Sequence, residues 1–179
     1  MPKEFTVKMS ANQTSLAENE DSRIFKFDNQ IKVPSYLIAL AIGDLERQPI
    51  GARTGVITEP AGMAAAVSEL QSLETYLDEV EKYVGVPYAW GHYDVLVLPP
   101  SFPFGGMENP LLTFLSPTMI TGDKSQIATA IHEVGHSWMG NLVTCKTWED
   151  VWLNESPTVF IQRKITEKIY GKERSSVES

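Results

Sequence analysis

The chain has 179 residues, of which 42% are apolar, a formal net charge of −8 and a single cysteine, Cys145. This composition suits a folded globular chain, and the acidic charge argues against nucleic acid or an anionic membrane as the main partner, because both require a basic face. One cysteine excludes an intrachain disulfide. The amino end lacks the apolar stretch of a signal peptide and no apolar run reaches the length of a membrane span, so we expect a cytoplasmic protein.

Short β-rich runs separated by Asn, Asp, Pro and Gly predict strands in the first third of the chain. The predicted strands cover residues 5–7, 23–27, 36–43 and 55–58. The polar run between the first two strands, residues 10–22, predicts a loop. This region buries little apolar surface by itself, so we expect it to be the end of a β-domain.

Apolar residues then recur at helical spacing and predict one continuous helix that Gly85 ends. These residues are Met63, Val67, Leu70, Leu73, Leu77, Val80 and Val84. The acidic residues between them, from Glu69 to Glu81, predict a solvated face. Two further strands are predicted at residues 93–99 and 111–115.

The last third of the chain predicts two helices. The first covers about residues 126–142, and its core stripe consists of Ile127, Ile131, Val134 and Trp138. The second covers about residues 157–170 and ends at Gly171.

The first of these two helices carries the motif HEVGH at residues 132–136. Residues i and i+4 project from the same face of a helix, so His132 and His136 can direct ring nitrogens at one ion. Glu133 is rotated by about 100° around the axis, which places its carboxylate beside the ion rather than on it. Because zinc lowers the pKa of water, Glu133 would accept a proton from it as the general base of a hydrolysis. The alternative is an ordinary amphipathic helix that happens to carry histidines.

A third ligand is required, because a catalytic zinc has three protein ligands and one open position. Glu155 lies in WLNES, at the start of the last predicted helix, where a neighbouring helix would present its carboxylate to the same ion. Two histidines and a carboxylate form the ligand set of a hydrolytic zinc site, which favours the zinc interpretation. Gly135 inside the helix costs about 1 kcal/mol relative to alanine, so we expect close packing at that position.

The run PPSFPFGGMENPLLTF contains a second unusual feature, a pair of glycines followed by Glu108. Glycines let the backbone approach a ligand closely, and a carboxylate on such a loop would bind the free α-ammonium of a substrate. A plain glycine turn before an edge strand explains this stretch equally well.

Three spaced motifs, GGMEN at 105–109, HEVGH at 132–136 and WLNES at 152–156, together resemble the gluzincin aminopeptidases, the aminopeptidase N-like family. The longer runs YDVLVLPPSFPFGGMENP, HSWMGNLVT and TWEDVWLNE resemble its leukotriene A-4 hydrolase branch. The resemblance extends from about Pro34 to Tyr170 and implies an α+β fold. Residues 1–44 would be the end of an amino-terminal β-domain, and residues 45–179 the first part of a thermolysin-like catalytic domain.

The resemblance also implies roles for individual residues. His132, His136 and Glu155 would hold one zinc ion per chain, and Glu133 would be the catalytic base. Glu108 would bind the free amino terminus of a peptide substrate. The other residues expected to bind substrate are Gly105, Gly106, Met107 and Asn109.

The sequence departs from the family pattern at several positions. Ser156 replaces the usual glycine after the third ligand, Gln162 stands where an acid is usual, and Phe104 stands where the hydrolase branch often has tyrosine. The transition-state tyrosine of the family lies well beyond the third ligand, and Tyr170 is not assigned that role. We therefore expect a fragment, a truncated gene product or an excised core, with weak or undetectable activity by itself.

The sequence therefore predicts a zinc metallo-aminopeptidase, which removes amino-terminal residues from peptides with a free amino terminus. Two alternatives stay open. One is a zinc-binding structural or interaction module without catalysis, and the other is epoxide hydrolysis, which only the leukotriene branch implies. Apolar faces left uncovered in a partial chain also predict self-association.

Overall fold

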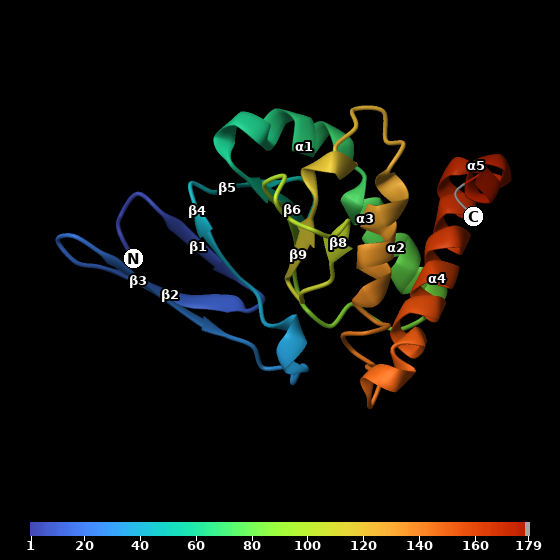
Figure 1. Ribbon diagram of the computed structural model, residues 1–179, viewed down its shortest axis with the longest axis horizontal. Coiled ribbons are helices and arrows are strands. Elements are labelled where there is room, and N and C mark those ends of the chain that lie inside the picture. The colour runs from blue at the N-terminus through green and yellow to red at the C-terminus, as the bar shows by residue number, and fades with distance from the viewer. Residues whose placement is uncertain (178–179) are drawn as a thin grey trace.

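The computed structural model describes residues 1–177 and confirms the predicted α+β class (Figure 1). Two antiparallel strand pairs at the amino end precede a five-stranded sheet and a set of helices. The strands are β1 (Thr6–Met9), β2 (Asn12–Glu18), β3 (Arg23–Asp28), β4 (Leu40–Gly43), β5 (Glu46–Pro49), β6 (Thr54–Thr58), β7 (Tyr93–Val97), β8 (Gly106–Met107) and β9 (Leu112–Leu115). The helices are α1 (Met63–Leu70), α2 (Leu73–Val84), α3 (Ile127–His136), α4 (Trp152–Tyr170) and α5 (Lys172–Val177), and short 3₁₀ turns are η1 (Ser35–Leu37), η2 (Pro60–Gly62), η3 (Pro117–Met119) and η4 (Trp148–Asp150).

The central sheet has the strand order β5-β6-β7-β9-β8. Strands β6, β7 and β9 run parallel to one another, and the edge strands β5 and β8 are antiparallel to their neighbours. Side chains alternate between the two faces of a strand, so Val56 joins the core under the helices while Ile57 joins a smaller core on the other face. Figure 1 shows the helices on one side of this sheet and strands β1 to β4 on the other.

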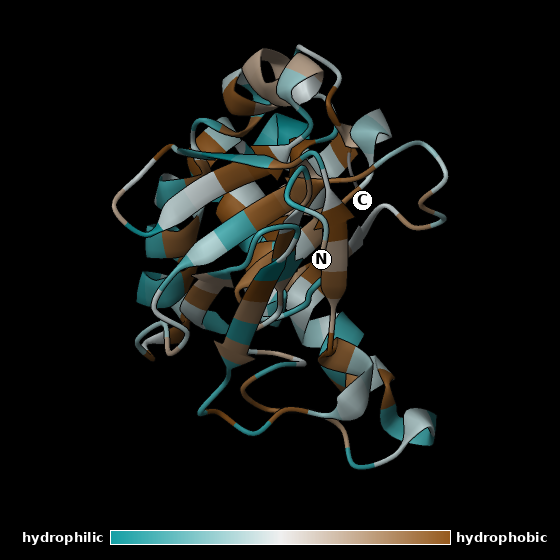
Figure 2. Cartoon of the chain, turned by 90° about the vertical axis from the view of Figure 1, so that its left-hand side faces the viewer, coloured by the Kyte–Doolittle hydropathy of each residue, from teal (hydrophilic) through white to brown (hydrophobic). Residues whose placement is uncertain are grey.

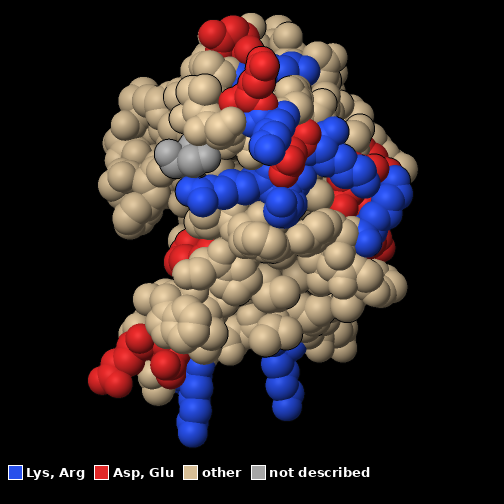
Figure 3. Space-filling model, turned by 90° about the vertical axis from the view of Figure 1, so that its right-hand side faces the viewer, with Lys and Arg blue, Asp and Glu red and all other residues tan. Residues whose placement is uncertain are grey.

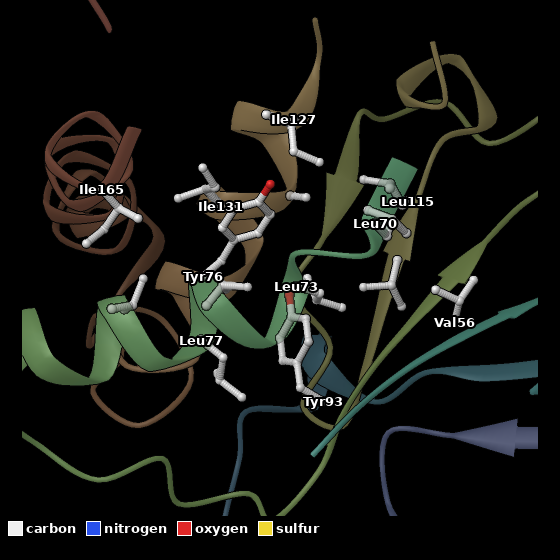
Figure 4. Packing of buried hydrophobic residues seen from close by; sticks show 14 of the residues in the cluster. Val56, Leu70, Leu73, Tyr76, Leu77, Tyr93, Leu115, Ile127, Ile131 and Ile165 are labelled. Carbon is white, nitrogen blue, oxygen red and sulfur yellow. The ribbon is translucent and has the colours of Figure 1, made fainter. Parts of the chain in front are cut away.

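The larger core fixes α3 against the sheet and its neighbouring helices (Figure 4). Tyr76 and Leu77 of α2 and Ile165 of α4 are fully buried beside Ile131 of α3. Burial of each such side chain contributes about 1.5–3 kcal/mol. The predicted stripe of α3 is confirmed, since its four residues, Ile127, Ile131, Val134 and Trp138, are each at most 2% exposed.

Arg53 connects the start of β6 to α2 through three carboxylates. Its guanidinium donates to Glu74 at 3.0 Å, Asp78 at 2.6 Å and Glu81 at 2.8 Å. Burial opposes ionisation of Glu74, but hydrogen bonds from Arg53 outweigh it and hold the pKa of Glu74 below its usual value. The same guanidinium lowers the pKa of Glu81.

Three expectations about the first half of the chain are wrong. The polar run predicted as a loop contains β2, whose seven residues are all exposed and which is held by pairing with β3. The single predicted helix is divided into α1 and α2, because Ser72 leaves helical geometry (φ −92°, ψ 9°) between them. Glu69 is not solvated but 2% exposed, and its carboxylate accepts hydrogen bonds from the backbone N–H groups of Gly122 and Lys124.

Helix boundaries in the second half also differ from the prediction. Helix α3 ends at His136, because the chain turns back at Gly140, whose φ of 117° is incompatible with a helix. Helix α4 begins at Trp152, five residues earlier than the predicted start at 157, so Glu155 lies in its first turn. Gly171 ends α4 as predicted, and the short helix α5 that follows was not predicted.

The surface carries apolar side chains at both ends of the molecule. On the amino-terminal strands, Figure 2 shows hydrophobic and hydrophilic residues beside one another, and Leu16, Ile24 and Leu40 are about half exposed. On the opposite side, Figure 3 shows basic and acidic side chains interleaved next to a largely uncharged area. Trp152 and Phe160 of α4 are more than half exposed. Within residues 1–177, none of the helices combines the length and apolarity that a membrane crossing requires.

Candidate metal centre

The histidine pair lies on the last turn of α3, where the buried stripe of the helix fixes its rotation. The rings of His132 and His136 meet edge to face, with centroids 4.5 Å apart, and their Nε2 atoms are 2.9 Å apart. His136 is 2% exposed, while His132 remains partly accessible. The i, i+4 spacing therefore directs both Nε2 atoms to one point, as predicted.

Glu155 reaches the same point from the first turn of α4. Its Oε2 lies 3.4 Å from Nε2 of His132 and 3.5 Å from Nε2 of His136. The three donor atoms are all within 4.8 Å of one another. Gly135 permits this approach of the helices, because a Cβ there would lie 3.1 Å from Cγ2 of Thr158 on α4. The expected close packing at Gly135 is thus confirmed.

The hydrogen-bond partners of the two Nδ1 atoms determine which nitrogen of each histidine ring carries the hydrogen. Nδ1 of His136 lies 2.7 Å from the carbonyl oxygen of Met139, which can only accept, so this nitrogen carries the hydrogen. Nδ1 of His132 lies 3.0 Å from Oε1 of Gln162 and donates to it. Gln162 therefore supplies a hydrogen-bond acceptor at the position where the family usually has an acid. In the neutral rings, both Nε2 lone pairs face each other and a carboxylate.

This donor set fits a zinc ion. Two unprotonated nitrogens at 2.9 Å repel each other unless a cation lies between them, and imidazole and carboxylate are ligands that zinc prefers. Without a metal, a proton takes that place. Although burial opposes the charged ring, the hydrogen bond with Glu155 and the nearby Glu108 and Glu133 raise the pKa of His136 to about 9. The two imidazoles hold the pKa of Glu155 well below its usual value.

Glu133 lies beside the three candidate ligands and is not one of them. It is 5% exposed, and its Oε2 has no hydrogen-bond partner among residues 1–177. Burial raises the pKa of the Glu133 carboxyl to about 8, and His136 opposes that shift while Glu108 adds to it. Gly106 leaves room for this carboxylate, because a Cβ there would lie 2.5 Å from Cδ of Glu133. A buried carboxylate with a free oxygen and this pKa can take up a proton near neutral pH.

The GGMEN loop forms the edge of the sheet next to α3. Gly106 and Met107 are strand β8, and Met107 pairs with Phe114 of β9. The backbone carbonyl of Glu108 accepts a hydrogen bond from Nδ2 of Asn141 at 2.7 Å, which fixes the loop next to the end of α3. Asn109 is 4% exposed, and its Nδ2 has no partner among the described residues.

A cavity of about 260 Å³ joins this loop to the start of α4. Glu108 and Glu155 both line it, so the structure brings the second unusual stretch of the sequence to the candidate metal ligands. The remaining lining residues are Tyr36, Phe104, Gly106, Met107, Trp148, Val151 and Asn154. Of the residues expected to bind substrate, Gly105 and Asn109 do not line this cavity.

Two residues of this site were missed by the sequence analysis. Asn154, 2% exposed, accepts the backbone N–H of Cys145 at 2.9 Å and donates to the hydroxyl of Tyr36 at 3.1 Å. Tyr36 also packs against Trp148, with ring centroids 4.9 Å apart. Asn154 directly precedes Glu155, so these contacts fix the first turn of α4. The one sequence signal was the position of Asn154 inside WLNES, because Tyr36 is 118 residues away.

Comparisons with known proteins find relatives that are named as a hydrolase and as aminopeptidases. The chain is 48% identical to leukotriene A-4 hydrolase of Xenopus laevis over 97% of its own length and 29% of the relative. It is 47% identical to leucine aminopeptidase 2 of Neurospora crassa over 84% of its own length and 23% of that relative. It is 46% identical to aminopeptidase B of Rattus norvegicus over 100% of its own length and 27% of that relative. The chain thus spans less than a third of the length of these relatives.

The fold is also that of a solved relative. Yeast LTA4 hydrolase in complex with bestatin superposes with a TM-score of 0.89 at 39% identity, over 97% of this chain and 27% of that structure. The Peptidase family M1 domain matches residues 68–179, which is more than half of the chain. The chain therefore belongs to peptidase family M1.

Proposed function

We propose that this chain carries the zinc site and the amino-terminus-binding loop of a metallo-aminopeptidase that acts on peptides with a free amino terminus. The observation that supports this proposal most is the convergence of His132, His136 and Glu155 within 4.8 Å, with the unpartnered carboxylate of Glu133 beside them. His132, His136 and Glu155 would hold one zinc ion. When bound, zinc supplies a Lewis acid that polarises a peptide carbonyl and lowers the pKa of water.

Glu133 is the proton carrier in this proposal. Its free Oε2 receives a proton from the attacking water, and the same carboxyl group then delivers that proton to the leaving amine. Its burial against Gly106 excludes bulk water from one side of the carboxyl group and prevents early loss of the proton.

Glu108 selects the end of the substrate. Its carboxylate lies on the loop that lines the same cavity as Glu155, where it can pair with the α-ammonium of the first residue. A cavity of about 260 Å³ has room for one side chain, which favours removal of a single residue at a time. Phe104 and Val151 supply apolar surface for that side chain.

The test combines zinc stoichiometry with hydrolysis of an aminoacyl-arylamide by the chain and its Glu133→Gln and Glu155→Gln variants. We expect one zinc per chain for the wild type and for Glu133→Gln, hydrolysis by the wild type alone, and weakened zinc binding in Glu155→Gln. Unchanged hydrolysis by Glu133→Gln would refute the mechanism. One zinc per chain without hydrolysis by the wild type would instead support a non-catalytic zinc module.

A further inference from the structure

A separate cavity of about 330 Å³ lies between the amino-terminal strands and the face of the central sheet that is turned away from the helices. None of the residues assigned above to metal or substrate lines it. Its charged lining consists of Lys8 on β1, Arg47 on β5, and His92 and Asp94 at the start of β7. Two permanent cations and one carboxylate therefore share this space.

Arg47 already pairs with both oxygens of the Asp94 carboxylate. Nε and Nη2 of Arg47 donate to the two oxygens of Asp94, each at 2.7 Å, and the Asp94 side chain is only 7% exposed. The pair crosses β6 at Gly55, where a Cβ would lie 2.7 Å from Nη2 of Arg47. Nη1 of Arg47 has no hydrogen-bond partner among residues 1–177 and is left available.

Lys8 is the unbalanced charge. It stands opposite Ala41 of β4, and directly opposed residues share a face of a strand pair. Ala41 packs on the core around Ile57, so Lys8 also faces the central sheet. Its ammonium has no hydrogen bond or ion pair within residues 1–177. Burial lowers the pKa of Lys8, Asp94 opposes that shift, and Arg47 adds to it.

His92 does not supply the missing negative charge. Its Nε2 lies 3.8 Å from Oδ2 of Asp94, and burial lowers its pKa, so the ring is neutral at pH 7 and can donate a hydrogen bond. The remaining polar groups of the lining are the neutral amides of Asn12 and Gln13. The cavity therefore has a surplus of one positive charge in a protein whose formal net charge is −8.

A partly desolvated charge is costly unless it is paired, and an anion in this cavity would pair it. We propose that the cavity binds a small oxyanion, a carboxylate or phosphate group that accepts hydrogen bonds from Lys8 and from Nη1 of Arg47. Met9, Phe27 and Leu111 form apolar walls, which favour an anion with a small apolar body over bare phosphate.

The test is calorimetric titration of the metal-free chain with benzoate, phenyl phosphate and inorganic phosphate, at constant ionic strength set with sodium chloride. Metal-free protein prevents the anions from binding at the zinc site, so failure here is distinct from failure of the proposed function. We expect one saturable site, with benzoate or phenyl phosphate bound more tightly than inorganic phosphate. If benzoate binds more tightly than phenyl phosphate, the preferred head group is a carboxylate, and the reverse order identifies a phosphate.

The matched variants are Lys8→Met, which removes the ammonium group and keeps an unbranched side chain of nearly the same length, and Lys26→Met, which removes an exposed lysine on β3. Loss of a charge-assisted hydrogen bond should lower the affinity of Lys8→Met by about tenfold or more, and Lys26→Met should bind as the wild type does. Equal binding by the wild type and Lys8→Met, or no saturable binding by the wild type, overturns the proposal.

Thermal unfolding at low salt provides an independent readout. Without the anion, Lys8→Met should unfold at a higher temperature than the wild type, because it removes an uncompensated charge. Benzoate should raise the midpoint of the wild type by more than it raises that of Lys8→Met at the same concentration. A lower midpoint of Lys8→Met in the absence of anion would show that Lys8 has a partner within the protein, and the proposal would be wrong.

Discussion

Replacement of Gly106 by alanine tests whether the position of the Glu133 carboxylate is set by β8. A Cβ at position 106 would lie 2.5 Å from Cδ and 2.8 Å from Cγ of Glu133. Carbon atoms in contact are normally about 3.5–4.0 Å apart, so the carboxyl group must move by roughly 1 Å. Gly106 does not have a positive φ, so the backbone itself accepts alanine and the side chain of Glu133 takes up the whole displacement.

We expect hydrolysis by Gly106→Ala to fall by about 100-fold, the effect that a misplacement of about 1 Å has on a catalytic group. Zinc stoichiometry should stay at one per chain, because Glu133 is not among the three converging ligands. The free energy of unfolding should fall by about 1 kcal/mol, the low end for overpacking, because the atoms that move are the end of a flexible side chain.

Gly105→Ala is the matched control in the same loop. Its Cβ would meet only Cγ2 of Thr129, at an ordinary distance of 3.6 Å, and its φ is also not positive. The two variants are compared by aminoacyl-arylamide hydrolysis, zinc stoichiometry and urea unfolding. If Gly106→Ala hydrolyses the substrate as fast as Gly105→Ala, the inference that β8 positions Glu133 is wrong.

Three further predictions concern other parts of the chain. Gln162→Glu should raise zinc affinity by about tenfold in a chelator competition, because a carboxylate accepts the Nδ1 hydrogen of His132 more strongly; lower affinity would contradict this. Gly135→Val should cost about 1–3 kcal/mol in urea unfolding and weaken zinc binding, because the first added carbon already lies 3.1 Å from Thr158; unchanged binding would show that the helices can separate freely. The third prediction concerns Glu74 and Glu81, whose pKa values are lower in the folded protein than in the unfolded chain because both pair with Arg53. Their ionised carboxylates stabilise the fold above the unfolded pKa of about 4.3, and this contribution to stability is lost as the pH falls through the lower pKa values of the folded state. Arg53→Met should therefore lose less stability than the wild type between pH 5 and pH 3 in acid titrations followed by circular dichroism, and parallel curves would refute this.

The parts of the site that follow from helix periodicity could be predicted from the sequence. The i, i+4 spacing places His132 and His136 on one face whatever else the chain does. The glycine at position 135 signalled a close helix contact, and Thr158 of α4 makes that contact. The family motif located Glu155, whose helix begins early enough to include it in the first turn.

The parts that depend on distant partners could not be predicted. Strand β2 has seven exposed residues, so it lacks the alternation of apolar and polar side chains by which strands are recognised, and only its pairing with β3 makes it a strand. Glu69 was predicted to be solvated because it lies among the acidic residues that separate the apolar positions of the predicted helix. Its hydrogen-bond partners are backbone N–H groups of a loop more than 50 residues later in the chain, and no local sequence pattern predicts these contacts.

The wall of the candidate substrate cavity shows the same dependence on distant segments, and it bears on the predicted domain division at Asp44. Tyr36 comes from the amino-terminal side of that division, yet it lines the cavity with Glu108 and Glu155 and accepts a hydrogen bond from Asn154. Removal of residues 1–44, which include Tyr36, would therefore take away part of the cavity wall and one of the contacts that fix the first turn of α4. With the boundary at Asp44, the geometry of the third candidate ligand depends on residues from both sides of it.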